Sequence, residues 1–203
     1  MKFKNIIFDF GKVTIKHDPK ALFCKFFDND EDIEKFLKDV EFSKVNNMAD
    51  KGMPFSEVKE IMLKNHPEYS EAIEAFDTRW IETIPGEDQG TLEIMESLRD
   101  KGYKMYGITN FSPEKFYKHK DKWTFPRYLE DIVVSGDVKE VKPEPEIFKI
   151  AIEQFGINPN ESIFIDDKFD NVNAADRLGF IGIQFKDSDQ LKIELEKLLT
   201  IKL

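Results

Sequence analysis

Five short apolar runs along the chain predict the buried strands of a sheet. They are residues 5–10 (NIIFDF), 103–109 (YKMYGIT), 131–135 (DIVVS), 162–166 (SIFID) and 180–185 (FIGIQF). Each run is rich in Ile, Val, Phe or Tyr and ends near Gly, Asp, Asn or Ser, which is typical of strands covered on both faces. Helical patterns separate the runs, and this alternation indicates a parallel α/β sheet.

Three segments between the strands have the spacing and the stop signals of amphipathic helices. Apolar residues recur every three or four positions in residues 90–102, 142–156 and 170–179. The second segment has a proline and glutamates near its start, as helix N-termini often do. A glycine closes each segment: Gly102, Gly156 and Gly179. We expect these helices to cover the sheet and complete a three-layer, Rossmann-like core.

The stretch between residues 16 and 85 shows no convincing strand. Helical spacing recurs instead in residues 31–40, 56–63 and 70–84. We therefore expect an all-helical insert over residues 16–85, within an α/β core built from residues 1–15 and 86–203. An insert at this point would overhang the carboxyl ends of the strands, where open α/β sheets bind ligands.

Composition narrows the functional classes. The chain has 203 residues, of which 40% are hydrophobic and 34% charged, a balance typical of a folded globular protein. No apolar run approaches the roughly 20 residues of a membrane span, and the single cysteine, Cys24, cannot form an internal disulfide. The N-terminal residues lack a signal-peptide pattern. The cytoplasm is therefore the expected location, and no membrane partner is expected.

The net charge of the chain argues against nucleic-acid partners. The net charge of −10 disfavours such binding, because it depends on Lys and Arg side chains that neutralise phosphates. One local exception is the basic segment 115–123 (KFYKHKDKW), in which aromatic residues are interleaved. We interpret it as a solvated helix face whose aromatic side chains turn inward. No nucleic-acid partner is expected.

Polar side chains follow four of the predicted strands. They are Asp9, Thr109, Asn110, Lys142, Asp166 and Asp167. Taken alone, each could be a turn or helix-capping residue. The adjacent carboxylates Asp166 and Asp167 repel each other, however, and a cation or strong hydrogen bonds must offset that repulsion. Because the carboxyl ends of parallel strands meet at one edge of a sheet, we expect these residues to form a single site.

This set of side chains suits phosphoryl transfer. Mg²⁺ prefers oxygen ligands and needs only a few carboxylates, because it keeps several waters. A carboxylate such as Asp9 can attack phosphorus and split hydrolysis into two easier steps. The transferring group carries negative charge, which a lysine and hydroxyl or backbone N–H donors can stabilise.

Four segments, in this order, resemble the motifs of the haloacid dehalogenase-like superfamily, most of whose members are Mg²⁺-dependent phosphatases. They are residues 8–13 (FDFGKV), 108–110 (ITN), 141–148 (VKPEPEIF) and 164–171 (FIDDKFDN). The resemblance covers nearly the whole chain. It implies a superfamily core fold in which the helical insert is the cap.

The resemblance also implies a role for each strand-end residue. Asp9 is expected to be the nucleophile, with Thr109 and Lys142 as its catalytic partners. Phosphate is expected to bind Thr109, Lys142 and the backbone of Asn110. The implied Mg²⁺ ligands are Asp9, the carbonyl of Gly11, Asp167 and, directly or through water, Asp166. The implied supporting residues of this shell are Asp170 and Asn171.

Gly11 departs from the pattern of many phosphatases of the superfamily, which have an aspartate there as general acid and base. Such help is typically worth about 10²–10⁴-fold in rate. A glycine at this position resembles a branch that includes glucose-1-phosphate phosphatases, which favours a substrate with a good leaving group, such as a sugar 1-phosphate or an acyl phosphate. Alternatively, His17 or Asp18 replaces the acid, or catalysis is weak and a binding role matters more.

These observations favour a Mg²⁺-dependent phosphomonoesterase that acts on a small phosphorylated metabolite, such as a sugar phosphate, through an aspartyl-phosphate intermediate. A 2-haloacid dehalogenase is the second enzyme hypothesis, and the acidic cluster in residues 166–171 argues against it because that substrate is an anion. A catalytically weak partner protein of the same fold is the third. The sequence leaves open the substrate, the cap residues that select it, the oligomeric state and the choice between Mg²⁺ and Mn²⁺.

Overall fold

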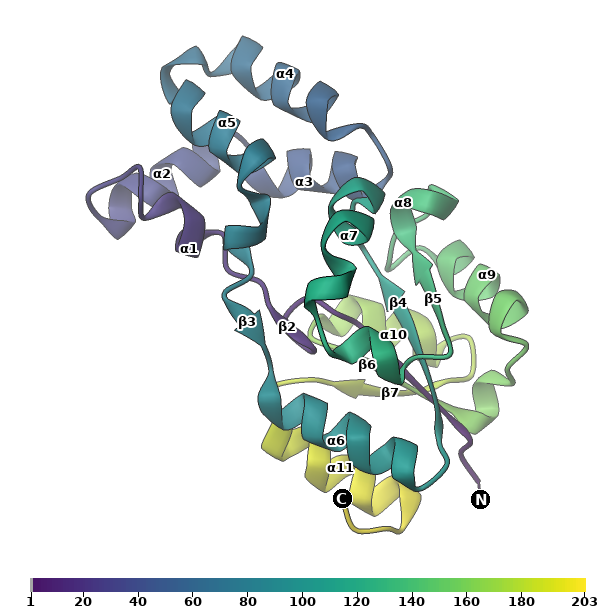
Figure 1. The fold of residues 1–203 in the computed structure, drawn as a ribbon. Coiled ribbons are helices and arrows are strands. Elements are labelled where there is room, and N and C mark those ends of the chain that lie inside the picture. The colour runs from purple at the N-terminus through teal and green to yellow at the C-terminus, as the bar shows by residue number, and fades with distance from the viewer. Residues whose placement is uncertain (1) are drawn as a thin grey trace.

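A five-stranded parallel sheet forms the centre of the core (Figure 1). The computed structural model describes residues 2–203. In spatial order the strands are β5 (Asp131–Val134), β4 (Lys104–Thr109), β1 (Asn5–Phe8), β6 (Ser162–Asp166) and β7 (Ile181–Gln184). Each predicted strand is confirmed, and all four pairings are parallel. Since β1 lies between β4 and β6, the carboxyl ends of these three strands adjoin.

Helices cover both faces of the sheet. Successive strand residues point to opposite faces, and both sets are apolar, so each face needs a covering layer. Ile6 and Phe8 pack in one hydrophobic cluster with α6 (Gln89–Asp100) and α11 (Ser188–Leu199). Ile7 packs in a second cluster with α9 (Pro145–Phe155) and α10 (Phe169–Asp176). The predicted three-layer α/β core is therefore confirmed, and α11 is a helix that the sequence pattern had not indicated.

A helical segment rises from this core between two short strands, β2 (Ile15–Lys16) and β3 (Gly86–Glu87), which pair antiparallel. Its helices are α1 (Lys20–Phe23), α2 (Asp30–Asp39), α3 (Phe42–Asp50), α4 (Phe55–Asn65) and α5 (Ser70–Thr78). We call this segment the cap; its predicted limits, residues 16–85, stay a prediction. Aromatic rings in edge-on or tilted contact hold it together: Phe23, Phe36, Phe42, Phe55 and Phe76.

One helix of the cap is shorter than its sequence predicted. Helical spacing over residues 70–84 indicated one helix, but α5 ends at Thr78 and a 3₁₀ turn follows at Trp80–Thr83. The Thr78 hydroxyl donates to the carbonyl of Glu74, an arrangement that often bends helices. The break lets the Trp80 ring pack against Phe111 of the core, with ring centroids 5.3 Å apart.

The cap is fastened to α7 (Pro113–His119) of the core. Lys115 Nζ donates to both the carboxylate and the carbonyl of Asp77, each at 2.8 Å, and it lies 3.9 Å from the centre of the Phe55 ring. The backbone N–H of Phe55 donates to Glu114. These contacts hold the cap over the carboxyl ends of the strands (Figure 1).

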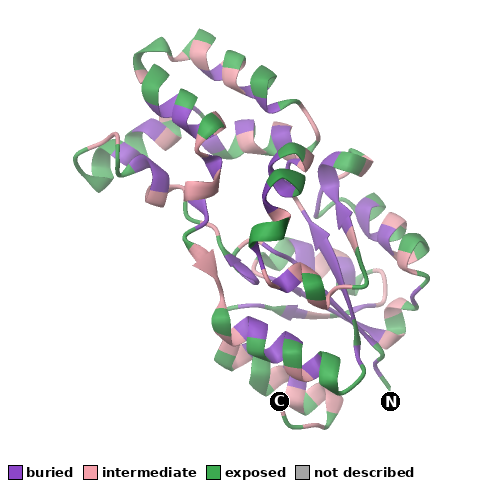
Figure 2. Cartoon of the chain, in the orientation of Figure 1, coloured by how far each residue is buried: buried purple, intermediate pink, exposed green. Residues whose placement is uncertain are grey.

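Burial follows the layers, with strands and inward helix faces buried and outer helix faces exposed (Figure 2). In the basic segment 115–123, Phe116 and Trp123 are buried, as the helix-face interpretation predicted, but Tyr117 is exposed and Lys115 is buried, so that interpretation holds only in part. None of the helices in residues 2–203 combines the length and the apolar character that crossing a lipid bilayer requires.

Candidate active site

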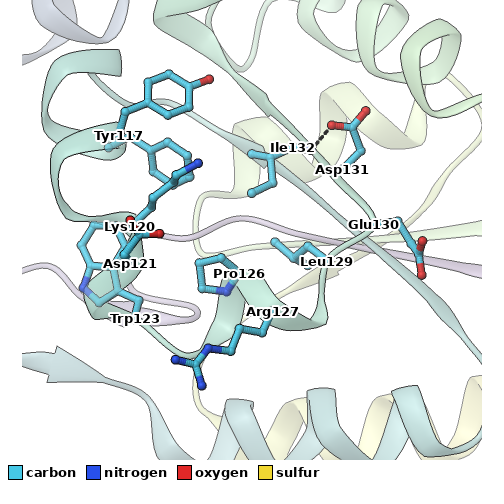
Figure 3. Close-up of a pocket in the computed structure, with 11 residues that line it drawn as sticks. Tyr117, Lys120, Asp121, Trp123, Pro126, Arg127, Leu129, Glu130, Asp131 and Ile132 are labelled. Atoms are coloured by element: carbon cyan, nitrogen blue, oxygen red, sulfur yellow. Dashed lines mark hydrogen bonds between the residues drawn. The ribbon is translucent and has the colours of Figure 1, made fainter.

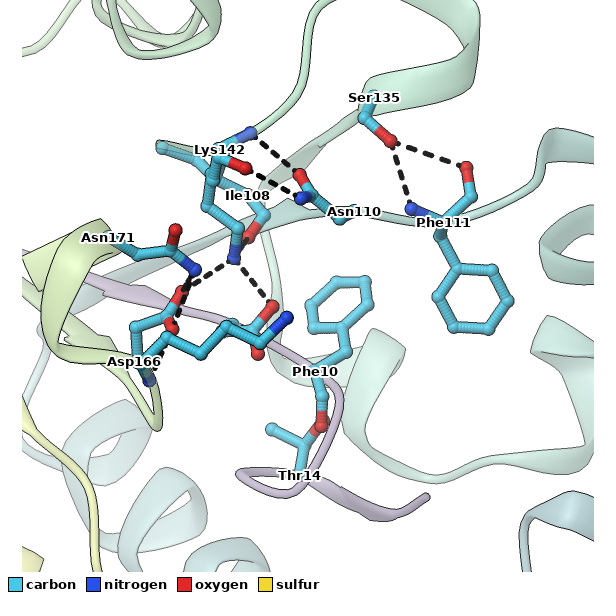
Figure 4. A network of polar contacts seen from close by, with 11 residues as sticks. Phe10, Thr14, Ile108, Asn110, Phe111, Ser135, Lys142, Asp166 and Asn171 are labelled. Atoms are coloured by element: carbon cyan, nitrogen blue, oxygen red, sulfur yellow. Dashed lines mark hydrogen bonds and ion pairs between the residues drawn. The ribbon is translucent and has the colours of Figure 1, made fainter. Parts of the chain in front are cut away.

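A buried lysine joins the ends of three adjacent strands. Lys142 Nζ donates to Asp9 Oδ1 at 2.6 Å, just beyond β1, and to Asp166 Oδ2 at 2.7 Å, at the end of β6. It also donates to the carbonyl of Ile108 in β4 at 2.7 Å (Figure 4). The lysine side chain is 1% exposed. The sheet thus brings together groups that lie far apart in the sequence.

The side chain of Asn110 fixes the backbone of Lys142. Asn110 Oδ1 accepts from the Lys142 N–H at 2.8 Å, and Asn110 Nδ2 donates to the Lys142 carbonyl at 2.9 Å (Figure 4). This pair of bonds ties the loop before α9 to the end of β4. Sequence reasoning assigned only the backbone of Asn110 a role, so the positioning function of its side chain is a new observation.

Asp166 is saturated with hydrogen bonds. Besides the contact with Lys142, its carboxylate accepts from the Lys168 N–H at 2.9 Å and from Asn171 Nδ2 at 2.9 and 3.0 Å. The side chain is 0% exposed. Such full hydrogen bonding lets a carboxylate stay buried, and it favours an orienting role over direct metal binding. Asp170, in contrast, is exposed on the first turn of α10.

Three carboxylates converge at this edge. One oxygen from each of Asp9, Asp166 and Asp167 lies within 4.8 Å of the others. When all three carboxylates are ionised, Lys142 offsets one of their charges, and one divalent cation would balance the two negative charges that remain. The cluster of oxygen donors therefore fits a hard cation such as Mg²⁺. Gly11 lies on the wall of the adjoining pocket together with Asp9 and Asp167.

The same excess of negative charge shapes the protonation of Asp9. Burial raises the pKa of Asp9 to about 7; Lys142 opposes this shift and Asp166 reinforces it. Lys142 is shared between two carboxylates, so its single charge does not offset both. Burial also raises the pKa of Asp167, and Asp166 adds to that shift. Without a cation, Asp9 therefore keeps its proton up to about pH 7, whereas the unfolded chain releases it near the ordinary pKa of 3.8.

Two buried hydroxyls near the cluster lack partners. Thr109 Oγ1, at the end of β4, and Ser112 Oγ, at the start of α7, have no hydrogen-bond partner within residues 2–203. A buried hydroxyl left without a partner costs about 1–3 kcal/mol. Ser112 lines the pocket at this edge, and Thr109 directly follows Ile108, whose carbonyl accepts from Lys142.

A pocket of about 810 Å³ opens between this edge and α3 of the cap. Its charged residues are Asp9, Lys12, Lys44, Asp50, Lys142, Asp167, Lys168 and Asp170, an even balance in a chain of net charge −10. Ser43, Asn46 and Asn47 add polar groups from the cap. Sequence reasoning missed the contributions of α3, although Phe42, Val45 and Ala49 have the helical spacing that could have revealed this helix.

The two proposed substitutes for an acid at Gly11 differ in position. His17 lines the pocket, but burial lowers its pKa to about 4, and Lys12 adds to the shift. It is therefore neutral near pH 7. Asp18 is absent from the pocket wall, and its Oδ1 accepts from the Lys20 N–H at 3.0 Å at the start of α1.

A second hollow, of about 500 Å³, lies at the amino end of β5 (Figure 3). Its wall includes Asp131 and Ile132, the first residues of that strand, together with Tyr117, Trp123 and Arg127. The carboxyl ends of the strands, where open α/β sheets place their sites, lie at the other edge. The cluster around Lys142 is therefore the candidate active site.

The protonation of Asp9 leads to a testable prediction about stability in EDTA. Because the pKa of Asp9 is higher in the folded chain (about 7) than its ordinary value of 3.8, the folded state binds more protons between these values. The stability contributed by this group therefore falls as the pH rises through that window. The melting temperature of Asp9→Asn minus that of the wild type should thus increase as the pH rises from about 5 to about 8.

The quantity to measure is the difference in melting temperature between the two proteins. The low pKa of His17 makes stability rise with pH, and this effect is the same in both proteins, so it cancels in the difference. Thermal melts at several pH values give this difference. A constant offset between wild type and Asp9→Asn would contradict the predicted titration of Asp9.

Comparison with known proteins agrees with this geometry. Residues 6–183 match the family described as haloacid dehalogenase-like hydrolase. The chain belongs to this family, as its four motifs predicted.

The chain is also similar to particular relatives. D-ribitol-5-phosphate phosphatase of Bacteroides thetaiotaomicron is 25% identical over 217 residues, which cover 97% of this chain and 98% of that protein. Flavin mononucleotide hydrolase 1 of Arabidopsis thaliana is 29% identical over 109 residues, and this match covers 54% of the chain and 44% of the relative. With several other curated relatives, too, the chain spans about half of their length.

Solved structures give the same result. A haloacid dehalogenase-family enzyme from Bacteroides thetaiotaomicron, crystallised with magnesium and inorganic phosphate, is 27% identical and has a TM-score of 0.69 over 91% of this chain and 95% of that one. The crystal structure of a dehalogenase with an intermediate complex is 17% identical, with a TM-score of 0.70 over 91% of this chain and 85% of that one. At that identity the likeness shows the fold alone.

Proposed function

We propose that the protein is a Mg²⁺-dependent phosphatase that hydrolyses a small phosphorylated sugar or sugar alcohol through an aspartyl-phosphate on Asp9. The observation that carries this proposal is the convergence of the Asp9, Asp166 and Asp167 carboxylates, two of which, Asp9 and Asp166, bond to one buried ammonium, Lys142. The magnesium and phosphate bound by a structural neighbour support it, as does the similarity to a sugar-alcohol phosphatase along nearly the whole chain.

In this proposal, Asp9, Asp167 and the carbonyl of Gly11 hold the cation, and Asp166 orients the site through its four hydrogen bonds. The cation supplies charge neutralisation for the phosphate oxygens. The carboxylate of Asp9 attacks phosphorus, and Lys142 keeps that carboxylate in place through its bond to Oδ1. Thr109 Oγ1, the Asn110 N–H and Lys142 Nζ stabilise the charge that develops on the transferring group. Asp170 and Asn171 support this shell.

The size of the pocket and the polar groups on its wall favour a small polar substrate. Its volume of about 810 Å³ suits a metabolite, and Ser43, Asn46 and Asn47 provide the hydrogen-bonding groups that hydroxyls need. Four lysines on its wall, Lys12, Lys44, Lys142 and Lys168, balance its four aspartates, so a bound divalent cation would give the pocket a net positive charge toward a phosphate dianion. We therefore propose a phosphate ester of a polyhydroxylated compound as the substrate.

The test is a phosphate-release screen over sugar phosphates, sugar-alcohol phosphates and simple alkyl phosphates, each with Mg²⁺ and with EDTA. The proposal predicts release that requires Mg²⁺ and is fastest with polyhydroxylated esters. The same assay series includes 2-chloropropionate with EDTA. Halide release there would identify a dehalogenase instead. Failure to hydrolyse every ester, with Mg²⁺ binding intact, would favour the partner-protein hypothesis.

A further inference from the structure

A carboxylate of the cap lines the active-site pocket, in addition to Asp9, Asp167 and Asp170 of the core. Asp50 is the last residue of α3 and lines the same pocket as Asp9 and Gly11. Its position matters because Gly11 leaves the site without a proton donor for the leaving group. None of the four motifs includes Asp50.

The core holds this end of α3 in place. Ser135 Oγ, directly after β5, donates to the carbonyl of Asp50 at 2.6 Å and accepts from the Phe111 N–H at 2.9 Å. Figure 4 shows the bonds between Ser135 and Phe111. Two residues after Asp50, Lys139 Nζ donates to the carbonyl of Gly52. The backbone of Asp50 is thus anchored to the sheet edge that carries the site.

Close packing reinforces this anchor. Gly52 has a φ of +85°, and a Cβ there would lie 2.4 Å from the carbonyl oxygen of Gly136. A residue with a side chain would therefore push α3 away from the core. The glycine, two residues from Asp50, thus allows the end of α3 to pack directly against the backbone of Gly136.

The side chain of Asp50 has one oxygen free. Asn46 Nδ2 donates to Oδ2 at 3.0 Å, whereas Oδ1 makes no hydrogen bond in the described part of the chain. No lysine or arginine there forms an ion pair with this carboxylate. Burial raises the pKa of Asp50 to about 7; Lys168 and Lys142 oppose the shift and Asp9 reinforces it. The group is therefore divided between its two protonation states near neutral pH, as a general acid and base requires.

We propose that Asp50 is a further catalytic residue of the phosphatase reaction, the general acid and base in the place that Gly11 leaves empty. This inference rests on the proposed function. As Asp9 Oδ bonds to phosphorus, the ester P–O bond breaks, and its electron pair stays on the leaving oxygen. The carboxyl proton of Asp50 passes to that oxygen and the alcohol departs. Asp50 then takes a proton from the water that attacks the aspartyl-phosphate, and the Asp9–phosphorus bond breaks to release phosphate.

The test compares two leaving groups in the first turnover with Mg²⁺. Glycerol 3-phosphate releases an alkoxide that needs a proton, whereas 4-nitrophenyl phosphate releases a phenolate that does not. Asp50→Asn should slow phosphoryl transfer from glycerol 3-phosphate by about 10²–10⁴-fold. It should leave the burst of nitrophenolate within about threefold of the wild type, because that step needs no acid. Asp28→Asn, an exposed cap carboxylate, is the matched control and should change neither rate.

A rescue strengthens the test. A Cβ at Gly11 would meet no atom within 4 Å, so Gly11→Asp places a carboxyl in open space. In the Asp50→Asn background it should restore transfer from glycerol 3-phosphate. If Asp50→Asn does not fold, Asn46→Ala replaces it. Loss of its hydrogen bond to the Asp50 carboxylate should move the alkaline limb of glycerol 3-phosphate hydrolysis to higher pH.

The outcomes separate the two proposals. If the wild type releases phosphate from neither ester, the proposed function fails and the role of Asp50 fails with it. If the wild type hydrolyses both esters and Asp50→Asn slows both bursts equally or neither, only the role of Asp50 is overturned. Hydrolysis of 4-nitrophenyl phosphate alone by the wild type overturns that role as well, since a site with an acid would use both.

Discussion

Asp9→Asn is expected to lower phosphate release by a factor of about 10⁴–10⁶, the range for removing catalytic residues from other hydrolases. The reason is chemical, because an amide oxygen cannot form the aspartyl-phosphate that divides hydrolysis into two steps. The fold should persist, since Asn is of similar size and the variant removes one of the charges that crowd around Lys142. Steady-state assays on the best ester of the screen, with circular dichroism to verify folding, measure the effect.

Asp131→Asn provides the matched control, because Asp131 is also an aspartate next to a strand terminus. It is the first residue of β5, lies at the amino ends of the strands, away from the site, and is exposed. This variant should retain wild-type turnover. Turnover by Asp9→Asn close to that of the wild type would rule out covalent catalysis through Asp9.

Lys142→Met should have the largest effect on stability. Its removal leaves Asp9 and Asp166 facing each other without the shared ammonium, and breaking a buried ion pair typically costs about 3–5 kcal/mol. For a chain of this size, that corresponds to a fall in melting temperature of roughly 6–20 °C. Activity should fall by on the order of 10²–10³-fold as well, because the positive charge proposed to stabilise the transferring phosphoryl group and to hold Asp9 in place is lost. Melts in EDTA at about pH 8, where carboxylates are ionised, give the sharpest measurement.

Two comparisons test the electrostatic origin of this effect. Mg²⁺ should recover part of the lost melting temperature, because it neutralises the same carboxylates. Lys149→Met, which removes an exposed lysine of α9 paired with Glu146, should change the melting temperature little. A melting temperature of Lys142→Met equal to that of the wild type would mean that Lys142 does not hold the two carboxylates together.

Much of the core could be predicted from the sequence because burial leaves a plain pattern. Strands covered on both faces read as uninterrupted apolar runs, such as residues 162–166, and all five runs became strands of one parallel sheet. The site followed from topology, since parallel strands deliver Asp9 and Asp166 to the same edge. The helices that were missed carry weaker patterns. In α11 only Leu191 and Leu195 are fully buried, and α3 interleaves its apolar positions with asparagines.

The contribution of the cap could not be predicted because it depends on tertiary placement. No spacing in the sequence relates Asp50 to Asp9, and their common pocket arises only when Ser135 anchors the end of α3. The same holds for the side chain of Asn110, whose two bonds to the Lys142 backbone cross between separate loops. Local patterns specify elements, whereas these contacts specify how the elements meet.

The most direct test of the account is to find where phosphate is covalently attached during turnover. Enzyme quenched in acid while it hydrolyses a radiolabelled ester with Mg²⁺ can be digested, and the labelled peptide sequenced. The account predicts label on the peptide that contains Asp9 and none on Asp9→Asn. Label on another residue, or full turnover with no labelled enzyme under conditions that trap acyl phosphates, would contradict it.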